Sequence, residues 1–320
     1  MIIQNLNTEL INAMKRYLPQ DSNLANNLMD ILYIGKEATY RRLRGEVPFT
    51  FAEVATISQQ MGISLDKIVG SMRKENAIFD LNLLHYSTPM DNYLSIVSSY
   101  IELFKRLSAE PVSTLSVASN VIPPTLYLRY EALSKFRLFK WLYHQEESST
   151  HKHYEELQIP TKLMDKQKEF VAVSQLFQSS YYIWDKETFP RLIRDIKYFS
   201  DIGLIAKDNV QELKAELFAL LEELEDVSSK GRFRTGKEVQ MYISNINFET
   251  SYSYVETMDY HLSLIRVFSI NSITTLDDFV FKNLKDWIVS LKKYSTLISQ
   301  SNEMERVRFF NEQQEIVNEL

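Results

Sequence analysis

The sequence contains no cysteine, which excludes disulfide bonds, thiolate nucleophiles and cysteine-ligated zinc. Glycine and proline are scarce, at 7 and 8 of 320 residues, and this scarcity predicts a chain made mostly of regular secondary structure. No apolar run reaches the length of about 18 residues that a membrane-spanning helix needs. The first residues also lack the apolar core of a signal peptide. We therefore expect a cytoplasmic protein that has no membrane partner.

Charge is divided unevenly along the chain. The whole sequence has a net charge of −6, from 36 basic and 42 acidic residues. Residues 1–74 contain nine basic and seven acidic residues and carry +2, so residues 75–320 carry −8. This asymmetry favours a first part that faces nucleic acid and an acidic second part that avoids it. With 45% hydrophobic residues, the chain can bury sizeable cores.

The first 70 residues predict a compact unit of five short helices. Apolar residues recur there at steps of three and four, between residues that interrupt helices, such as Pro19, Gly35 and Gly62. Pro48 and Thr50 are suited to open the fourth helix. The side chains expected to be buried in that helix are Phe51, Val54, Ile57 and Met61. The five predicted helices cover residues 6–18, 23–33, 36–44, 50–62 and 65–70.

The second part of the chain predicts both helices and strands. A polar stretch at residues 73–76 marks the expected boundary and divides the chain into two domains, 1–74 and 75–320. Residues 112–118 have strand character, and three alternating segments predict an antiparallel meander at 239–247, 250–259 and 261–271. Helices are expected near residues 89–107, 125–144, 160–180, 187–200, 207–229, 275–300 and 302–319. The predicted fold class is mainly α: a five-helix domain followed by an α+β domain with one small antiparallel sheet.

Residues 24–70 contain an ordered series of signals. A helix that ends at Leu32 is followed by the turn 33–35 and by a helix, 36–44, that ends at Gly45. The tail that follows has apolar or small residues at Phe51, Ala55, Ile57, Met61, Gly62, Ile63, Ser64, Leu65 and Ile68. This order resembles the lambda-repressor-like (XRE-type) helix-turn-helix family. The resemblance covers about a fifth of the chain and implies a DNA-binding domain of a transcriptional regulator.

Helix 36–44 is the recognition helix that this resemblance implies. The major groove admits one α-helix, whose outward side chains are polar or cationic while its other face packs. We expect Tyr40 and Leu43 to pack inward and Ala38 to lie at the helix crossing. Four cations and one acid in nine residues then give the helix a local charge of +3.

Each polar residue of this helix has an expected role at a DNA surface. In folds of this kind the N-terminal part of the helix faces the bases, so Lys36, Glu37 and Arg41 are expected to read sequence. Phosphate contacts, which position the protein without specifying sequence, are expected from Arg42, Arg44 and Lys15. Thr39 is suited to either role. Family members often carry glutamine or serine pairs where this chain has Lys36 and Glu37, so the preferred bases stay open.

The function of the second domain stays open at this point. A single small helix-turn-helix domain makes few contacts, so a homodimer on two half-sites is expected. A helical seam in 207–229 either packs internally or pairs two copies; it consists of Val210, Leu213, Leu217, Leu220 and Leu224. A small-molecule or peptide effector is a further open partner, because aromatic residues could line a ligand cavity. These residues are Tyr242, Phe248, Tyr252, Tyr254, Tyr260, Phe268, Trp184 and Trp287.

Two short motifs suggest other chemistry but lack the context that it needs. Residues 231–237 match the G-x-x-x-x-G-K core of a phosphate-binding loop, yet Glu238 replaces the required serine or threonine. A helix is also expected before this segment and a strand after it, which is the reverse of the required order. The H-x-H motif at residues 151–153, near His144, Glu146 and Glu147, lies in a polar segment that is typical of a solvated loop. We therefore expect no catalytic activity, no cofactor and no metal; the main alternative to a DNA-binding regulator is an adaptor whose first domain binds a protein.

Overall fold

The chain forms two compact units in the computed structural model, residues 1–78 and 79–320. The structure describes residues 2–18, 23–70, 77–84, 88–143 and 153–320. None of the described helices combines the length and the apolar character needed to cross a bilayer.

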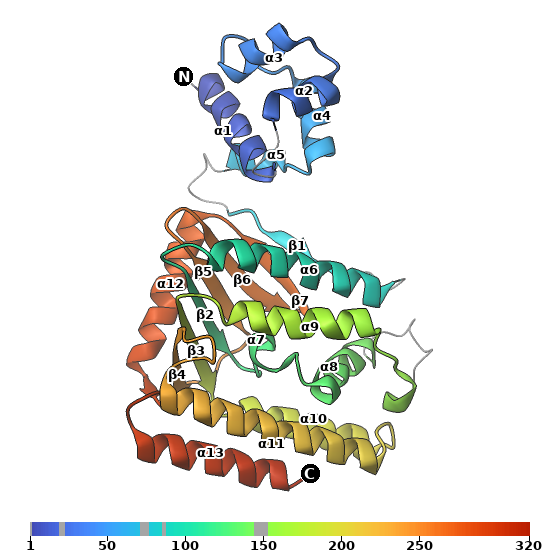
Figure 1. Cartoon of the computed structure of the whole chain (residues 1–320), viewed down its shortest axis with the longest axis vertical. Coiled ribbons are helices and arrows are strands. Elements are labelled where there is room, and N and C mark those ends of the chain that lie inside the picture. The colour runs from blue at the N-terminus through green and yellow to red at the C-terminus, as the bar shows by residue number, and fades with distance from the viewer. Residues whose placement is uncertain (1, 19–22, 71–76, 85–87, 144–152) are drawn as a thin grey trace. The chain divides into compact units, whose positions relative to one another are not determined.

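The first unit is a bundle of five helices, and the five helices predicted from periodicity are confirmed (Figure 1). They are α1 (Ile2–Tyr17), α2 (Leu24–Leu32), α3 (Lys36–Leu43), α4 (Phe51–Met61) and α5 (Leu65–Gly70). Local signals explain their ends. Thr50 and Glu53 form a reciprocal capping box at the start of α4, and Gly62 ends this helix in the left-handed conformation, at a φ of 68°. The core joins α1, α2 and α4 through Met14, Leu28 and Ile57, whose side chains are fully buried.

The second unit contains one eight-stranded mixed sheet, in the order β1-β7-β6-β5-β2-β3-β4-β8. The strands are β1 (Asp80–Asn82), β2 (Thr114–Ser119), β3 (Ser179–Asp185), β4 (Glu238–Ser244), β5 (Tyr252–Glu256), β6 (His261–Val267), β7 (Asn271–Thr275) and β8 (Ser295–Leu297). Strands β2, β3 and β4 are parallel, and the neighbouring pairs on both sides of them are antiparallel. The prediction of a mainly α protein with a small antiparallel sheet is therefore wrong.

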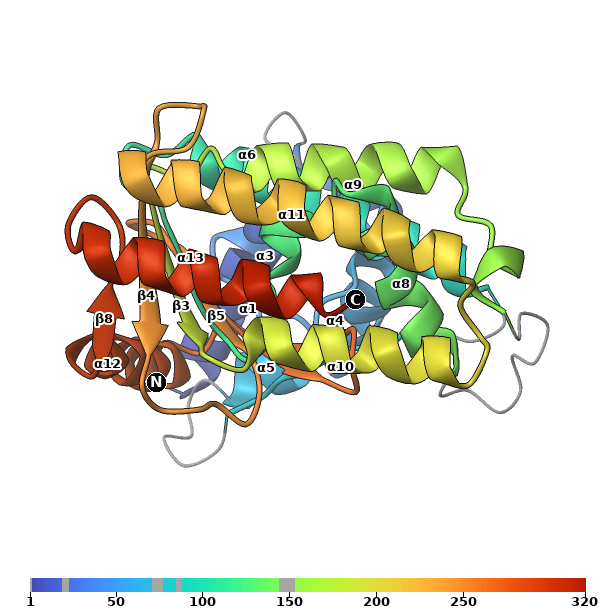
Figure 2. The ribbon, with the colours of Figure 1, turned by 90° about the horizontal axis from the view of Figure 1, so that it is seen from below.

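Helices cover both faces of this sheet (Figures 1 and 2). One face packs against α12 (Asp278–Lys293) through a cluster around Ile183, Phe281 and Ile288. The other face carries the larger core and the remaining helices. These are α6 (Pro89–Ser108), α7 (Pro124–Tyr127), α8 (Glu131–Tyr143), the 3-10 helix η2 (Tyr154–Glu156), α9 (Thr161–Ser174), α10 (Thr188–Asp201), α11 (Lys207–Lys230) and α13 (Glu303–Asn318).

The predicted meander is only partly correct. Strands β5 and β6 are antiparallel neighbours as predicted, and β7, which begins at Asn271 and was not predicted, pairs with β6 in the same way. Strand β4 is not one of them, because it pairs with β3 and β8. Residues 160–180 were also predicted as one helix, so β3, which begins at Ser179 and lies between β2 and β4, was missed. The sequence of β3 does not alternate, which is typical of a strand covered on both faces, whereas the segments of β4, β5 and β6 do alternate and were predicted as strands.

Candidate nucleic-acid interface

Helix α3 follows α2 after a turn of three residues. Tyr33 ends α2 in the left-handed conformation, at a φ of 53°, and Gly35 is the extended N-cap of α3. The last turn of α3 is closed by the Arg44 amide, which donates to the Tyr40 carbonyl at 2.9 Å. Gly45 follows with a φ of 74°, a conformation that glycine adopts without strain. A helix, a short turn and a second helix therefore present α3 as an eight-residue element on the first unit.

The packed face of α3 differs from the prediction by one residue. Thr39 is completely buried, and its hydroxyl donates a hydrogen bond of 3.1 Å to the Gly35 carbonyl. Leu43, four residues later, packs against the core of the unit as predicted. Tyr40 is 37% exposed, so the prediction that it packs inward is wrong. Thr39 consequently lies out of reach of DNA bases or phosphates, whereas Tyr40 becomes available to a partner.

The exposed face of α3 brings together most of the predicted contact residues. Lys36, Glu37, Arg41 and Arg44 are all exposed, together with Tyr40. Lys15 is exposed as well, on α1. The structure therefore presents three of the four expected cations of the helix to the surroundings.

Arg42 is the cation that does not point outward. Its Nη2 lies 2.7 Å from Oε1 of Glu53, and its Nε donates to Oε2 of the same carboxylate at 3.2 Å. The two side chains are only 15% and 16% exposed. Glu53 also accepts a hydrogen bond of 2.8 Å from the Thr50 amide at the start of α4. Arg42 thus ties α3 to α4, which conflicts with its expected role as a phosphate contact.

Glu46 modulates the charge of the exposed face. Its carboxylate accepts hydrogen bonds of 2.6 and 3.3 Å from Arg44 and lies 3.6 Å from Nε of Arg41. The hydrogen bond from Arg44 lowers the pKa of Glu46, which keeps the carboxylate ionised. With Arg42 neutralised by Glu53, the three exposed cations face two carboxylates, Glu37 and Glu46. The net charge of this face is therefore about +1, not the +3 expected from the sequence of the helix alone.

Exposed aromatic side chains are the functional candidates that sequence reasoning missed. Tyr33, in the turn before α3, is 93% exposed, and Phe51 at the start of α4 is 83% exposed. Phe51 was predicted to be buried; instead Val54, Ile57 and Met61 contribute the packed face of α4. The sequence did contain an indication that Phe51 is exposed, because it is the first residue of its helix and lies next to the N-cap Thr50.

The glycine-rich segment 231–237 of the second unit connects a helix to a strand. Gly231 ends α11 in the left-handed conformation, and β4 begins at Glu238, so the helix precedes the strand as predicted for residues 231–237. His144, Glu146, Glu147 and His151 lie outside the described residues. Among the residues that the structure does describe, no group of three histidine or carboxylate side chains could hold a metal ion.

The aromatic residues that were considered for a ligand cavity divide between the two faces of the sheet. Trp287 packs against Tyr252 on the α12 side, at 4.7 Å between ring centroids, and Trp184 is buried beside Phe309 of α13. Phe268 is exposed. Of the eight candidates, only Tyr254 is among the lining residues of the apolar cavity between α6 and the sheet.

No protein-family model matches the chain, and comparisons with curated proteins and with solved structures also find no match.

Proposed function

We propose that the first unit binds double-stranded DNA through α3, and that the protein is a homodimeric transcriptional regulator. The observation that carries the proposal is the exposed face of α3, where Lys36, Arg41 and Arg44 surround Tyr40 while Thr39 and Leu43 anchor the opposite face. An α-helix held on one side and cationic on the other fits the width of the major groove.

Roles follow from position on the helix. Lys36, Glu37 and Arg41 lie in the part of α3 that would face base edges, and a guanidinium can donate two hydrogen bonds to guanine. Arg44 and Lys15 would contact phosphates. The ion pairs of Glu46 with Arg41 and Arg44 are exposed and exchange readily for phosphate contacts, since surface ion pairs contribute little to stability.

The competing proposal is a protein-binding adaptor, and the exposed aromatic residues Tyr33 and Phe51 favour it, because aromatic side chains are common in protein interfaces. Salt dependence separates the two functions. Displacement of counterions from DNA makes the logarithm of the binding constant fall linearly with the logarithm of salt concentration.

The test is binding of the full-length protein to a random duplex pool, followed by selection of the bound sequences. Arg41→Ala should weaken binding to the selected site by about 1–3 kcal/mol and broaden the sequence preference. Arg44→Ala should weaken binding to all sequences alike and reduce the salt slope by about 1 for each phosphate contact that is lost. Arg194→Ala is the matched control, because it removes an exposed arginine from α10 of the other unit.

Two results would contradict the proposal. One is binding that does not change in the Arg41→Ala/Arg44→Ala double variant; the other is an absence of salt-dependent binding to any duplex. Arg42→Ala is unsuitable for this experiment, because its loss also breaks the link between α3 and α4.

A further inference from the structure

A cavity of about 140 Å³ lies between α6 and one face of the sheet in the second unit. The register of the strands explains which side chains line it. Strand residues alternate between the two faces, and Ser253 pairs with both Val117 and Leu264, while Arg266 pairs with Ser272. These side chains share the face that lies opposite α12. Four strands therefore contribute one continuous wall to the cavity.

Most of the wall is apolar. Val97 and Phe104 of α6, Phe170 of α9 and the leucines of β6 cover much of the interior. A cavity of about 150 Å³ with apolar walls is large enough for a benzene ring. The space therefore suits a small molecule with an apolar body and is too small for a peptide.

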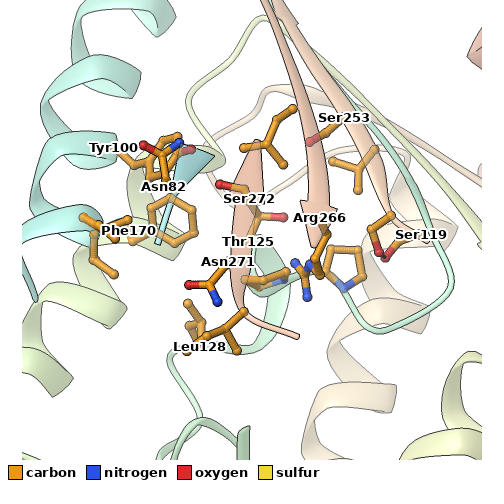
Figure 3. Close-up of a pocket in the computed structure, with 18 of the residues that line it drawn as sticks. Asn82, Tyr100, Ser119, Thr125, Leu128, Phe170, Ser253, Arg266, Asn271 and Ser272 are labelled. Carbon is orange, nitrogen blue, oxygen red and sulfur yellow. Dashed lines mark hydrogen bonds between the residues drawn. The ribbon is translucent and has the colours of Figure 1, made fainter. Parts of the chain in front are cut away.

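Two arginines also line the cavity, Arg137 of α8 and Arg266 of β6. Arg137 donates a hydrogen bond of 2.6 Å to the hydroxyl of Tyr93. Arg266 differs, because within the described part of the chain no carboxylate, carbonyl or hydroxyl accepts a hydrogen bond from its guanidinium. The lining residues include no aspartate or glutamate. Figure 3 shows the Arg266 side chain among the lining residues, between the labelled Asn271 and Ser119 in that view.

The surroundings of Arg266 are unfavourable for its positive charge. Burial, and then the nearby positive charge of Arg137, lower the pKa of Arg266 to about 10. The group still keeps its proton at neutral pH, so a partly buried cation lies at the cavity without an opposing carboxylate among the lining residues. Buried charges in proteins are normally paired or bind an ion, because an unpaired one destabilises the fold.

Neighbouring polar groups would complete an anion site. Ser253 lines the cavity on β5, and its hydroxyl has no hydrogen-bond partner among the described residues, so it can donate to a ligand. Ser272 lies opposite Arg266 on β7 and hydrogen-bonds to Tyr100. Asn271 is already engaged, since its side chain donates to the Phe268 carbonyl and accepts from the Leu84 amide.

We propose that this cavity binds a small organic anion, a carboxylate on an apolar body, through the guanidinium of Arg266. The planar fork of arginine matches the two oxygens of a carboxylate, and the apolar wall accommodates the rest of the molecule. The proposal does not depend on DNA binding by the first unit, so either can fail without the other.

The experiment compares benzoate with benzamide, its neutral counterpart of nearly the same shape, by calorimetric titration of the full-length protein. Benzoate should bind about tenfold more tightly or better, because a charge-assisted hydrogen bond is roughly twice as strong as a neutral one. Inorganic phosphate tests whether charge alone is sufficient, and it should bind more weakly than benzoate, since it has no apolar body.

Two variants locate the site. Arg266→Met should abolish the preference for benzoate over benzamide and should also raise the unfolding temperature of the ligand-free protein by about 2–4 °C, as an unpaired, partly buried charge is removed. Ser253→Leu should weaken both ligands by filling part of the cavity, while both arginines remain. Arg194→Met, an exposed arginine of the same unit, is the control and should bind both ligands like the wild type.

The proposal is overturned if wild-type protein binds benzoate no better than benzamide, or if phosphate binds as tightly as benzoate. It is also overturned if Arg266→Met keeps the preference, or if this variant unfolds at a lower temperature than the wild type, because the arginine would then be a structural contact. The comparison of ligands on the wild type needs no variant, so it decides the matter even where a substitution prevents folding.

Discussion

The pair of Arg42 and Glu53 joins two helices of the first unit through one carboxylate. Glu53 accepts hydrogen bonds from the Arg42 guanidinium and from the Thr50 amide, so a single side chain caps α4 and holds α3. Burial raises the pKa of Glu53, but the hydrogen bonds from Arg42 and Thr50 outweigh this effect, so its pKa lies below the usual value. The folded unit therefore stabilises the ionised form of the Glu53 carboxylate.

Arg42→Ala should lower the free energy of unfolding of the first unit by about 1–2 kcal/mol at pH 7, since the pair is largely but not fully buried. A carboxyl group whose pKa is lowered by folding contributes stability above its unfolded pKa, here 4.5, and this contribution is lost as the pH falls through the folded value. The difference between wild type and variant should therefore shrink below about pH 4.5. Thermal unfolding between pH 3 and 7 measures it, and Arg41→Ala, at an exposed position nearby, is the control.

A difference between wild type and Arg42→Ala that stayed constant down to pH 3 would contradict this assignment. The loss would then come from packing of the arginine side chain and not from its charge.

Residue positions on α3 were predicted less well than the helix itself. Successive residues of an α-helix are about 100° apart, so an error of one residue moves a side chain from the packed to the exposed face. Thr39 has a hydroxyl that suggests exposure, but it bonds to the Gly35 carbonyl of its own helix and can therefore be buried. Only the folded backbone shows that this acceptor is available.

The position of Arg266 in the sequence indicates that its side chain faces inward. In the segment 261–267, the alternation predicts a strand whose buried face includes Leu262 and Leu264. Arg266 is two residues further on, so its side chain lies on the same face. A charged residue on the apolar face of a strand is typical of a strand end or of a binding site. Distinguishing these two requires the neighbouring strands, which come from distant parts of the chain.

At the scale of elements, the leucine seam of α11 packs within the chain. Val210, Leu213, Leu217, Leu220 and Leu224 are all buried in the large core of the second unit. The neighbours of α11 include α8, α10 and α13. Internal packing, one of the two alternatives left open by the sequence, is thus observed for this seam, and its side chains are not on the surface where a second copy could contact them.

Leu217→Ala should destabilise the second unit by about 2–5 kcal/mol, because the side chain is completely buried and its removal leaves a cavity. The oligomeric state should stay unchanged. Chemical denaturation measures the stability, and light scattering measures the molar mass. Glu222→Ala, at an exposed position of the same helix, should leave the stability within about 0.5 kcal/mol of the wild type. A lower molar mass in Leu217→Ala with little loss of stability would show that the seam joins copies after all.

The sheet shows where local patterns fail. Strand β3 reads Ser-Ser-Tyr-Tyr-Ile-Trp-Asp and follows α9 without an intervening glycine or proline. Its partners, β2 and β4, begin at residues 114 and 238. A central parallel strand is covered on both faces and lacks the alternation of an outer strand, whereas β5 and β6 alternate and were found. Strands β1 and β8 are three residues each, too short for a periodic signal.

At the scale of the whole molecule, the two units have separate cores. The first unit relies on one small cluster from its own helices, and the second combines a large cluster with a smaller one beneath α12. Small domains bury a smaller fraction of their surface and are less stable. We therefore expect each unit to unfold in a separate transition.

Differential scanning calorimetry of the full chain should show two transitions, with the first unit unfolding at the lower temperature. Arg42→Ala should lower only the first transition and Leu217→Ala only the second, because the affected contacts belong to different cores. A single transition that both variants shift by similar amounts would contradict the independence of the units.

The sequence by itself determined the five helices of the first unit, because caps, breakers and apolar periodicity act between residues that are close along the chain. It also determined the division of charge between the two parts. Only the tertiary structure decided which cations of α3 are free, because Glu53 and Glu46 reach them from outside the helix. The eight-stranded sheet and the cavity around Arg266 were likewise decided at this level, because two of the pairings that assemble them, β1 with β7 and β2 with β5, join residues more than 100 positions apart. Such pairing depends on the whole chain and leaves no local pattern from which it could be predicted.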